Sequence, residues 1–215
     1  MNRFTTVILL GTLAAALAIG ARPASAASNA YEGRRLFTTY CLVCHGPKGD
    51  GHGPLATALK KSPANFLSAD VAKKSDQELY LTIDSGKSHD EILGMPRWSS
   101  VLPPPQIEDI IAYIRFLERS RYPLVGDPQQ GRDVYRTYCT VCHGGGGKGD
   151  GVMTQLLPIH PADHTNRKEM DAISNEDLAR TIADGELVKF MPAWKTVLNA
   201  GEIESLVGYI RLLSH

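Results

Sequence analysis

The sequence lacks several features that would place it in common classes of protein. Its charges balance, with 23 Lys and Arg residues against 23 Asp and Glu residues. A nucleic-acid-binding protein would carry a basic stripe, so no nucleic-acid partner is expected. Beyond residue 20 no apolar run is long enough to span a bilayer. Strand-like alternation of apolar and polar residues is also missing, which argues against a β-sheet protein.

The N-terminus has the layout of a secretory signal peptide. Arg3 precedes an apolar run from Thr6 to Gly20, and small residues follow at 24–26. The run is short for a membrane span, and no cysteine near it offers a lipoprotein anchor. We therefore expect residues 1–26 to be removed and the mature protein to be soluble and periplasmic. An uncleaved N-terminal membrane anchor is the alternative.

Cysteine is scarce, but its placement is informative. An even number of cysteines in an exported protein usually indicates disulfides. The 4 cysteines of this chain instead form two close pairs with the same spacing, and a histidine follows each pair at once. The two motifs are Cys41-Leu42-Val43-Cys44-His45 and Cys139-Thr140-Val141-Cys142-His143.

Both motifs have the form C-x-x-C-H, the attachment pattern for c-type haem. On a helix, thiols three residues apart share a face and can add to the two vinyl groups of the porphyrin. A redox-active dithiol would need a βαβ context, and a zinc site would need pairs about 15–20 residues apart. The sequence thus predicts two covalently attached haem c groups, whose iron is ligated by His45 and His143.

The two halves of the chain repeat each other. Gly33 and Phe37 before the first motif correspond to Gly131 and Tyr135 before the second. Three further pairs of segments match in the same order: Lys48-Gly49-Asp50-Gly51 with Lys148-Gly149-Asp150-Gly151, Pro63-Ala64-Asn65 with Pro161-Ala162-Asp163, and Gly94-Met95-Pro96-Arg97-Trp98 with Phe190-Met191-Pro192-Ala193-Trp194. Such order indicates a duplication, with one domain at 27–122 and a second at 123–215.

Met95 and Met191 are predicted to be the second axial ligands of the two irons. Each lies at the same place in its repeat and precedes a proline, which would hold the loop stiffly. His/Met pairing is known for cytochromes c. The rival histidines do not align with one another, and we expect them to be solvated loop residues. These rivals are His52 and His89 in the first half and His160 and His164 in the second.

The remaining pattern is helical. The spacing of residues from Gly33 to Cys44, repeated from Gly131 to Cys142, follows one helix face. A capping box at 75–78 opens a middle helix, and 174–177 is a weaker version of it. Each half closes on a helix with an apolar stripe. The stripes are Ile107, Ile110, Ile111 and Ile114 in the first half, and Ile203, Leu206, Val207 and Ile210 in the second.

These marks resemble those of class I cytochrome c, twice over. The tandem arrangement after a signal peptide is similar to the two-haem bacterial cytochromes of the c-four type. The resemblance implies an all-α fold of two tandem domains, each wrapped around one covalent haem. It further implies that Gly33 and Phe37 meet Ile110 and Tyr113 where the first and last helices cross. The second half would place Gly131 and Tyr135 against Leu206 and Tyr209.

The resemblance also implies that a carbonyl following the first loop accepts a hydrogen bond from the proximal imidazole. Pro54 is in the expected place for His45, whereas the second half offers Val152 or Met153. This difference predicts a looser second pocket.

Electron transfer is the function that these patterns favour. Iron with His and Met on both axial sides has no open position for a substrate, so we expect a carrier rather than an enzyme. Its partners would be a donor and an acceptor redox protein, including membrane respiratory complexes, with no small-molecule substrate. The alternatives are a two-haem peroxidase or oxidoreductase with one open or switchable iron, or a cytochrome subunit of a membrane dehydrogenase or oxidase complex.

Overall fold

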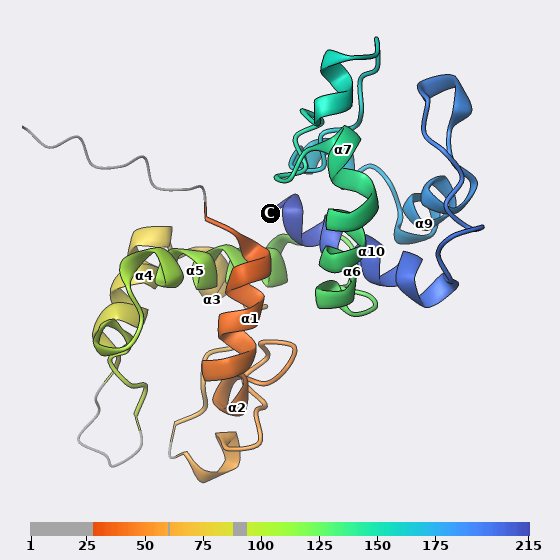
Figure 1. Ribbon diagram of the computed structural model, residues 1–215. Coiled ribbons are helices and arrows are strands. Elements are labelled where there is room, and N and C mark those ends of the chain that lie inside the picture. Colours follow the sequence, from red (N-terminus) through yellow and green to blue (C-terminus); the bar gives the residue numbers. More distant parts are fainter. Residues whose placement is uncertain (1–27, 60, 88–93) are drawn as a thin grey trace, which may run out of the picture.

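The computed structural model describes residues 28–59, 61–87 and 94–215, and it consists of two helical units (Figure 1). No strand occurs among these residues, and the only ladder contacts there are two isolated β-bridges. The predicted all-α class is therefore confirmed. The segment predicted as a signal peptide lies outside the described residues.

The α-helices follow one another in the same order in the two units, whereas the short 3-10 and π segments differ. The first unit comprises α1 (Ala30–Tyr40), α2 (Leu42–His45), η1 (Ala56–Ala58), α3 (Ala69–Ala72), α4 (Asp76–Ser85), η2 (Trp98–Ser100) and α5 (Pro104–Arg119). The second comprises α6 (Pro128–Val134), the π-helix η3 (Tyr135–Cys139), α7 (Thr140–His143), η4 (Val152–Gln155), α8 (Arg167–Met170), α9 (Asn175–Asp184), η5 (Leu187–Lys189) and α10 (Ala200–Leu213).

The first and last helices of each unit cross at a glycine. A Cβ atom added at Gly33 would lie 1.8 Å from the backbone oxygen of Asp109, and one at Gly131 would lie 1.9 Å from that of Ser205. Real Cβ atoms never approach so closely, so only glycine permits these crossings.

Aromatic rings flank both crossings. The rings of Phe37 and Tyr113 meet at 5.3 Å, and those of Tyr135 and Tyr209 meet at the same distance. The helix contact that the family resemblance implied is thus present in both units.

The closing helices bury their apolar stripes as predicted. All eight stripe residues of α5 and α10 are buried, and they form the centre of the core with the aromatic residues of α1 and η3. The middle helices α4 and α9 begin at Ser75 and Ser174. The capping box at Ser75 is complete, because the Glu78 side chain returns to the Ser75 backbone N–H. At Ser174 only the hydroxyl caps the helix.

In each unit one buried arginine, which was not predicted from the sequence, links the closing helix to the segment before the middle helix. Arg211 is buried, and its guanidinium donates to the backbone oxygens of Met170 and Ile173 and to Asn175. In the first unit, Arg115 occupies the same place in the repeat. It donates to the backbone oxygen of Lys74 and to the carboxylates of Asp76 and Glu118.

The two units touch through α1 and the end of α5 in the first unit, and through α6, α8 and the C-terminal end of the chain in the second. The Tyr31 ring is buried, lies 5.3 Å from the Tyr209 ring in an edge contact, and carries the Arg132 guanidinium 5.0 Å from its centre. Arg167 also donates to the backbone oxygen of Arg119 at 2.7 Å. A half-buried His215 ring meets Phe116 edge-on at 5.1 Å. The contact between the two units therefore consists mainly of aromatic and positively charged side chains rather than of aliphatic ones.

Candidate functional site

Each C-x-x-C-H motif lies where the regular α-helix is interrupted. In the first unit, α1 ends at Tyr40 and α2 begins at Leu42, with Cys41 between them at φ −108°. In the second unit a π-helical turn ends at Cys139, and α7 follows it without a gap. The predicted helix face is therefore present in both units, with an irregular turn at the first cysteine in one and a π-helical turn before the second cysteine in the other.

The cysteine thiols are unpaired and partly buried. Burial and the neighbouring Cys44 raise the pKa of Cys41 to about 12, and burial and Cys142 raise that of Cys139 to about 12. A dithiol redox site needs a thiolate at neutral pH, which a raised pKa opposes. The raised pKa of Cys41 and of Cys139 thus argues against dithiol redox chemistry at either motif.

The histidines of the two motifs are held in one orientation. His45 Nδ1 lies 3.2 Å from the backbone oxygen of Ala64, and His143 Nδ1 lies 3.1 Å from that of Ala162. Burial lowers the pKa of both imidazoles. A neutral ring that donates through Nδ1 keeps its lone pair at Nε2, the state in which an imidazole binds a metal.

This geometry corrects the predicted acceptors of the two imidazoles. Neither Pro54 nor Val152 or Met153 accepts from the histidine. The preceding glycines, Gly53 and Gly151, bond back to the carbonyls of the second cysteines at 3.1 and 3.0 Å and turn the chain away. The acceptor carbonyls lie later in the chain and are equivalent in the two units, so the predicted looseness of the second pocket has no basis at this position.

The two predicted methionine ligands lie in matching short bridges. The Lys87 N–H donates to the Met95 oxygen at 3.0 Å, and the Glu186 N–H donates to the Met191 oxygen at 2.8 Å. Each bridge follows a glycine with positive φ at the end of the middle helix, Gly86 or Gly185.

These two glycines are site residues that sequence reasoning missed. A Cβ atom at Gly86 would lie 2.5 Å from the Met95 oxygen, and one at Gly185 would lie 2.7 Å from the Met191 oxygen. Their equal placement after α4 and α9 was a signal in the sequence that could have identified them.

In the first unit the predicted residues line one cavity of about 280 Å³. Cys41, Cys44 and His45 lie on its wall together with Met95 and Trp98. The rest of the wall includes the apolar side chains Phe37, Phe66, Ile83, Ile110 and Ile114. An apolar chamber with two thiols, one imidazole and one thioether fits a haem. Among the described residues, no group of three or more His, Cys, Asp or Glu side chains could hold a metal ion by itself.

The second unit repeats this arrangement. Cys139, Met191 and Trp194 pack against the core. The Trp194 ring lies 5.4 Å from Tyr138, as Trp98 lies 5.5 Å from Tyr40. Both tryptophans therefore pack against a tyrosine of the segment before the C-x-x-C-H motif.

His164 is not the solvated loop residue that the sequence analysis expected. Its side chain is buried, with 6% exposure, and its ring is stacked on that of His143 at 4.3 Å. Its Nδ1 lies 3.0 Å from the Tyr135 hydroxyl. Burial lowers the pKa of His164 to about 3, so the ring is neutral.

The equivalent residue in the first unit is Phe66, stacked on His45 at 4.6 Å. This correspondence was readable, because Pro63-Ala64-Asn65 and Pro161-Ala162-Asp163 extend by one residue to Phe66 and His164. An apolar residue at the matching position indicates burial. Of the other rivals, His52 and His160 are exposed as expected, and His89 lies outside the described residues.

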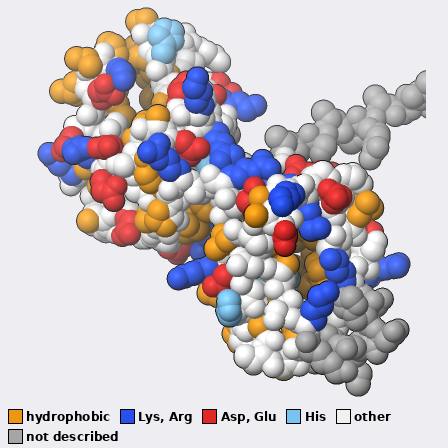
Figure 2. Space-filling model, turned by 180° about the vertical axis from the view of Figure 1, so that it is seen from behind, with side chains coloured by type: hydrophobic (Ala, Val, Ile, Leu, Met, Phe, Trp, Pro, Cys, Tyr) orange, Lys and Arg blue, Asp and Glu red, His pale blue; other side chains and the backbone are white. Residues whose placement is uncertain are grey.

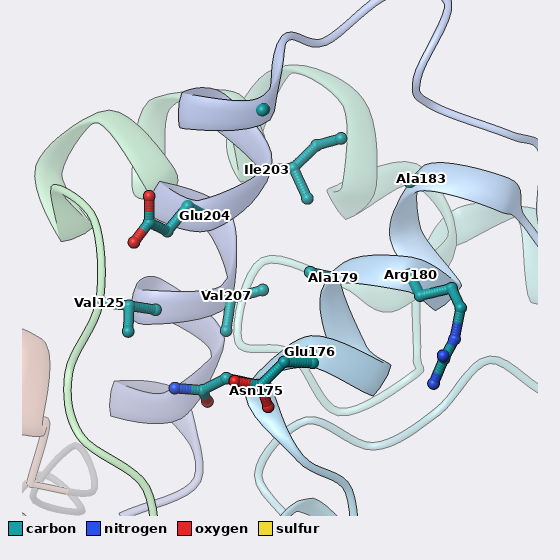
Figure 3. Close-up of a pocket in the computed structure, with 10 residues that line it drawn as sticks. Val125, Asn175, Glu176, Ala179, Arg180, Ala183, Ile203, Glu204 and Val207 are labelled. Atoms are coloured by element: carbon teal, nitrogen blue, oxygen red, sulfur yellow. The ribbon is translucent and has the colours of Figure 1, made fainter.

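A second depression lies apart from this site. It is an open groove of about 400 Å³ between α9 and α10, lined by Ala179, Ala183, Ile203 and Val207, with Val125 of the connecting segment opposite (Figure 3). None of the predicted site residues lines it. On the face seen in Figure 2, charged side chains of both signs are interspersed over both units. That face therefore carries no basic stripe.

The chain is similar to known proteins over most of its length. The sequence model of the family described as "Cytochrome C oxidase, cbb3-type, subunit III" matches residues 28–114 and again 126–210. Among curated proteins, the cbb3-type cytochrome c oxidase subunit FixP of Azorhizobium caulinodans is 23% identical over 85% of this chain and 59% of its own length. Subunit CcoP of Azospirillum brasilense is 27% identical over 84% of this chain and 61% of its own length.

The chain thus spans about 60% of the length of these relatives. Among solved structures, a chain of the reducing HAO-like protein complex of Kuenenia stuttgartiensis is 24% identical. The match covers 86% of this chain and 96% of that one, with a TM-score of 0.38.

Proposed function

Because the chain belongs to the family of cbb3-type cytochrome c oxidase subunit III and is a two-haem cytochrome c, we propose that it transfers electrons through two closed haem sites. Each haem is attached by the two cysteines of one C-x-x-C-H motif. The domains that hold them are residues 27–122 and 123–215. When bound, the haem iron supplies a one-electron ferric/ferrous couple.

The axial ligands that we propose are His45 with Met95 in the first unit and His143 with Met191 in the second. Support comes from the Nδ1 bonds to Ala64 and Ala162, which leave Nε2 free for iron. The bridges at Met95 and Met191 hold the loops that would supply the thioether ligands. A thioether ligand raises the reduction potential, as a carrier late in an electron chain requires.

The observation that carries this proposal is the repetition of the whole arrangement. Both units have the same imidazole–carbonyl bond, the same glycine-led bridge at the methionine and the same tyrosine–tryptophan contact. An enzyme built from such a pair would need one site to differ at an axial position. The apolar residues around the first cavity exclude water from the metal, which suits transfer of an electron without binding of a substrate.

We further propose that the protein is exported to the periplasm and docks with a donor and an acceptor protein. The N-terminal pattern at 1–26 supports export. None of the helices in the described part of the chain has the length and apolarity needed to cross a membrane.

A second candidate role is that of an electron-transfer subunit in an oxidase complex. The names of the FixP and CcoP relatives favour it. Purification in mild detergent distinguishes the two roles, since an oxidase subunit co-purifies with its membrane partner and a free carrier elutes alone.

Absorption spectra and mass spectrometry of the purified protein test the closed sites. We expect a mass gain of two haems, the far-red methionine–iron band in the oxidised state and no spectral shift with carbon monoxide. The Met95→Ala and Met191→Ala variants should each lose about half of that band, whereas Met153→Ala, which has no counterpart in the first unit, should retain it. A carbon monoxide shift in the unaltered protein would contradict closed ligation and favour an enzyme.

A further inference from the structure

The two sites differ in the buried side chains that stack on the histidine of each C-x-x-C-H motif. In the first unit the Phe66 ring is stacked on His45 at 4.6 Å and 18°. Phe37 meets Phe66 edge-on at 6.0 Å, and both phenylalanines are buried. His45 therefore stacks on a purely apolar pair of rings.

In the second unit the same two places carry a polar pair. His164 is stacked on His143 at 4.3 Å and 17°, so its ring has the pose of Phe66. Tyr135, which replaces Phe37, is fully buried and lies 3.0 Å by its hydroxyl from His164 Nδ1. The other supports of the proximal histidines are alike, because the bonds to Ala64 and Ala162 measure 3.2 and 3.1 Å. The stacked pair is thus a difference in direct contact with the histidine of each motif.

Such a difference acts on the reduction potential of the iron. Oxidation adds one positive charge, and a polar environment stabilises the charged state more than an apolar one does. The hydroxyl and imidazole dipoles of Tyr135 and His164 lie in a buried region, where dipoles act more strongly than in water. The effect of this buried polar pair is therefore to favour the ferric state.

The difference in net charge between the two units would shift their potentials in the same direction as the pair does. Residues 27–122 contain 12 basic and 11 acidic side chains, whereas residues 123–215 contain 9 basic and 12 acidic ones. A surplus of negative charge also favours the ferric state, although solvent and salt screen exposed carboxylates. The buried pair is the larger influence because it touches the proximal ligand.

We propose that the Tyr135–His164 pair lowers the reduction potential of the second haem below that of the first, so that electrons pass from the second unit to the first. This inference rests on the proposed electron-transfer function. The pair consists of positioning residues, which act through His143 rather than on the iron. The second unit is then the side that accepts electrons from the donor, and the first unit delivers them.

Redox titration of the intact two-haem protein, followed by absorption, tests the assignment. The Tyr135→Phe/His164→Phe variant gives the second unit the apolar pair of the first, and Phe37→Tyr/Phe66→His does the reverse. We expect two midpoints in the unaltered protein. The first variant should raise the lower midpoint and leave the higher one in place. The reciprocal variant should lower the higher midpoint and leave the lower one in place.

Movement of the higher midpoint by Tyr135→Phe/His164→Phe would overturn the assignment, as would midpoints that neither variant shifts. Mass spectrometry and the methionine–iron band serve as the control, since both must be unchanged for a shift to be attributed to the pair. A missing haem or a missing band in the unaltered protein would instead refute the proposed function.

Discussion

At the scale of single residues, the pair behind the second proximal histidine is coupled energetically. Tyr135 and His164 satisfy each other by one hydrogen bond inside the core. A buried polar group that loses its partner costs about 1–3 kcal/mol, whereas replacing both partners by apolar residues of similar shape is nearly neutral. The rings of Phe37 and Phe66 show that this fold accommodates the apolar alternative.

We therefore expect Tyr135→Phe alone to lower the free energy of unfolding by about 1–3 kcal/mol, because it strands the His164 nitrogen. Adding His164→Phe should recover most of that loss. Thermal or denaturant unfolding of the two single variants and the double variant measures the coupling. Additive losses would show that the two side chains do not depend on each other.

Individual residues also differ in whether their place in the site could be predicted from the sequence. The cysteines, proximal histidines and methionines were identifiable because chemistry fixes their side chains and the repeat fixes their places. The acceptors at Ala64 and Ala162 were not, because a backbone carbonyl leaves no trace in the identity of its residue. The burial of His164 could not be predicted from the other histidines, with which it does not align. Its counterpart Phe66 does indicate a buried position.

At the scale of helices, the crossings at Gly33 and Gly131 organise each unit. They let α1 lie against α5, and α6 against α10, with backbone nearly touching backbone. The crossings and the apolar stripes were predictable, since both follow from helical spacing and from the family resemblance. The irregular turn at Cys41 and the π-helical turn that ends at Cys139 were not, because the apolar periodicity continues across such small interruptions.

Gly33→Ala should destabilise the first unit by about 3 kcal/mol, since forcing atoms into a packed contact costs about 1–3 kcal/mol and here the obstacle is backbone. Gly145→Ala is the matched control, because a Cβ at that glycine meets nothing within 4 Å. Calorimetry should show a lower melting temperature for the first variant only. Equal melting temperatures would mean that the crossing can widen without cost.

At the scale of the whole molecule, one aromatic residue makes several of the contacts between the units. Tyr31 belongs to α1, yet it touches Tyr209, Arg132 and Gln129 of the second unit. Removing this ring takes away an edge contact, a cation–π contact and buried apolar area together. The first and last helices of each unit nevertheless pack mainly against each other, so each unit has the means to unfold by itself.

Tyr31→Ala should therefore separate the unfolding of the two units, which calorimetry would record as two transitions in place of one. Tyr31→Phe keeps the ring and loses only the hydroxyl bond to Gln129, so its transition should stay close to that of the unaltered protein. If the alanine variant also unfolds in one step, the remaining contacts, such as Arg167 with the Arg119 carbonyl, are enough to couple the units.

The two stacked pairs also constrain how the copies came to differ after the duplication. A chain with a tyrosine at position 135 beside a phenylalanine at 164, or with a histidine at 164 beside a phenylalanine at 135, buries a polar group without its partner at a cost of about 1–3 kcal/mol. Neither single change is therefore a neutral step, in either direction. Once both had been made, the cost of returning one at a time protected the difference, and the two copies could no longer drift back to the same pocket.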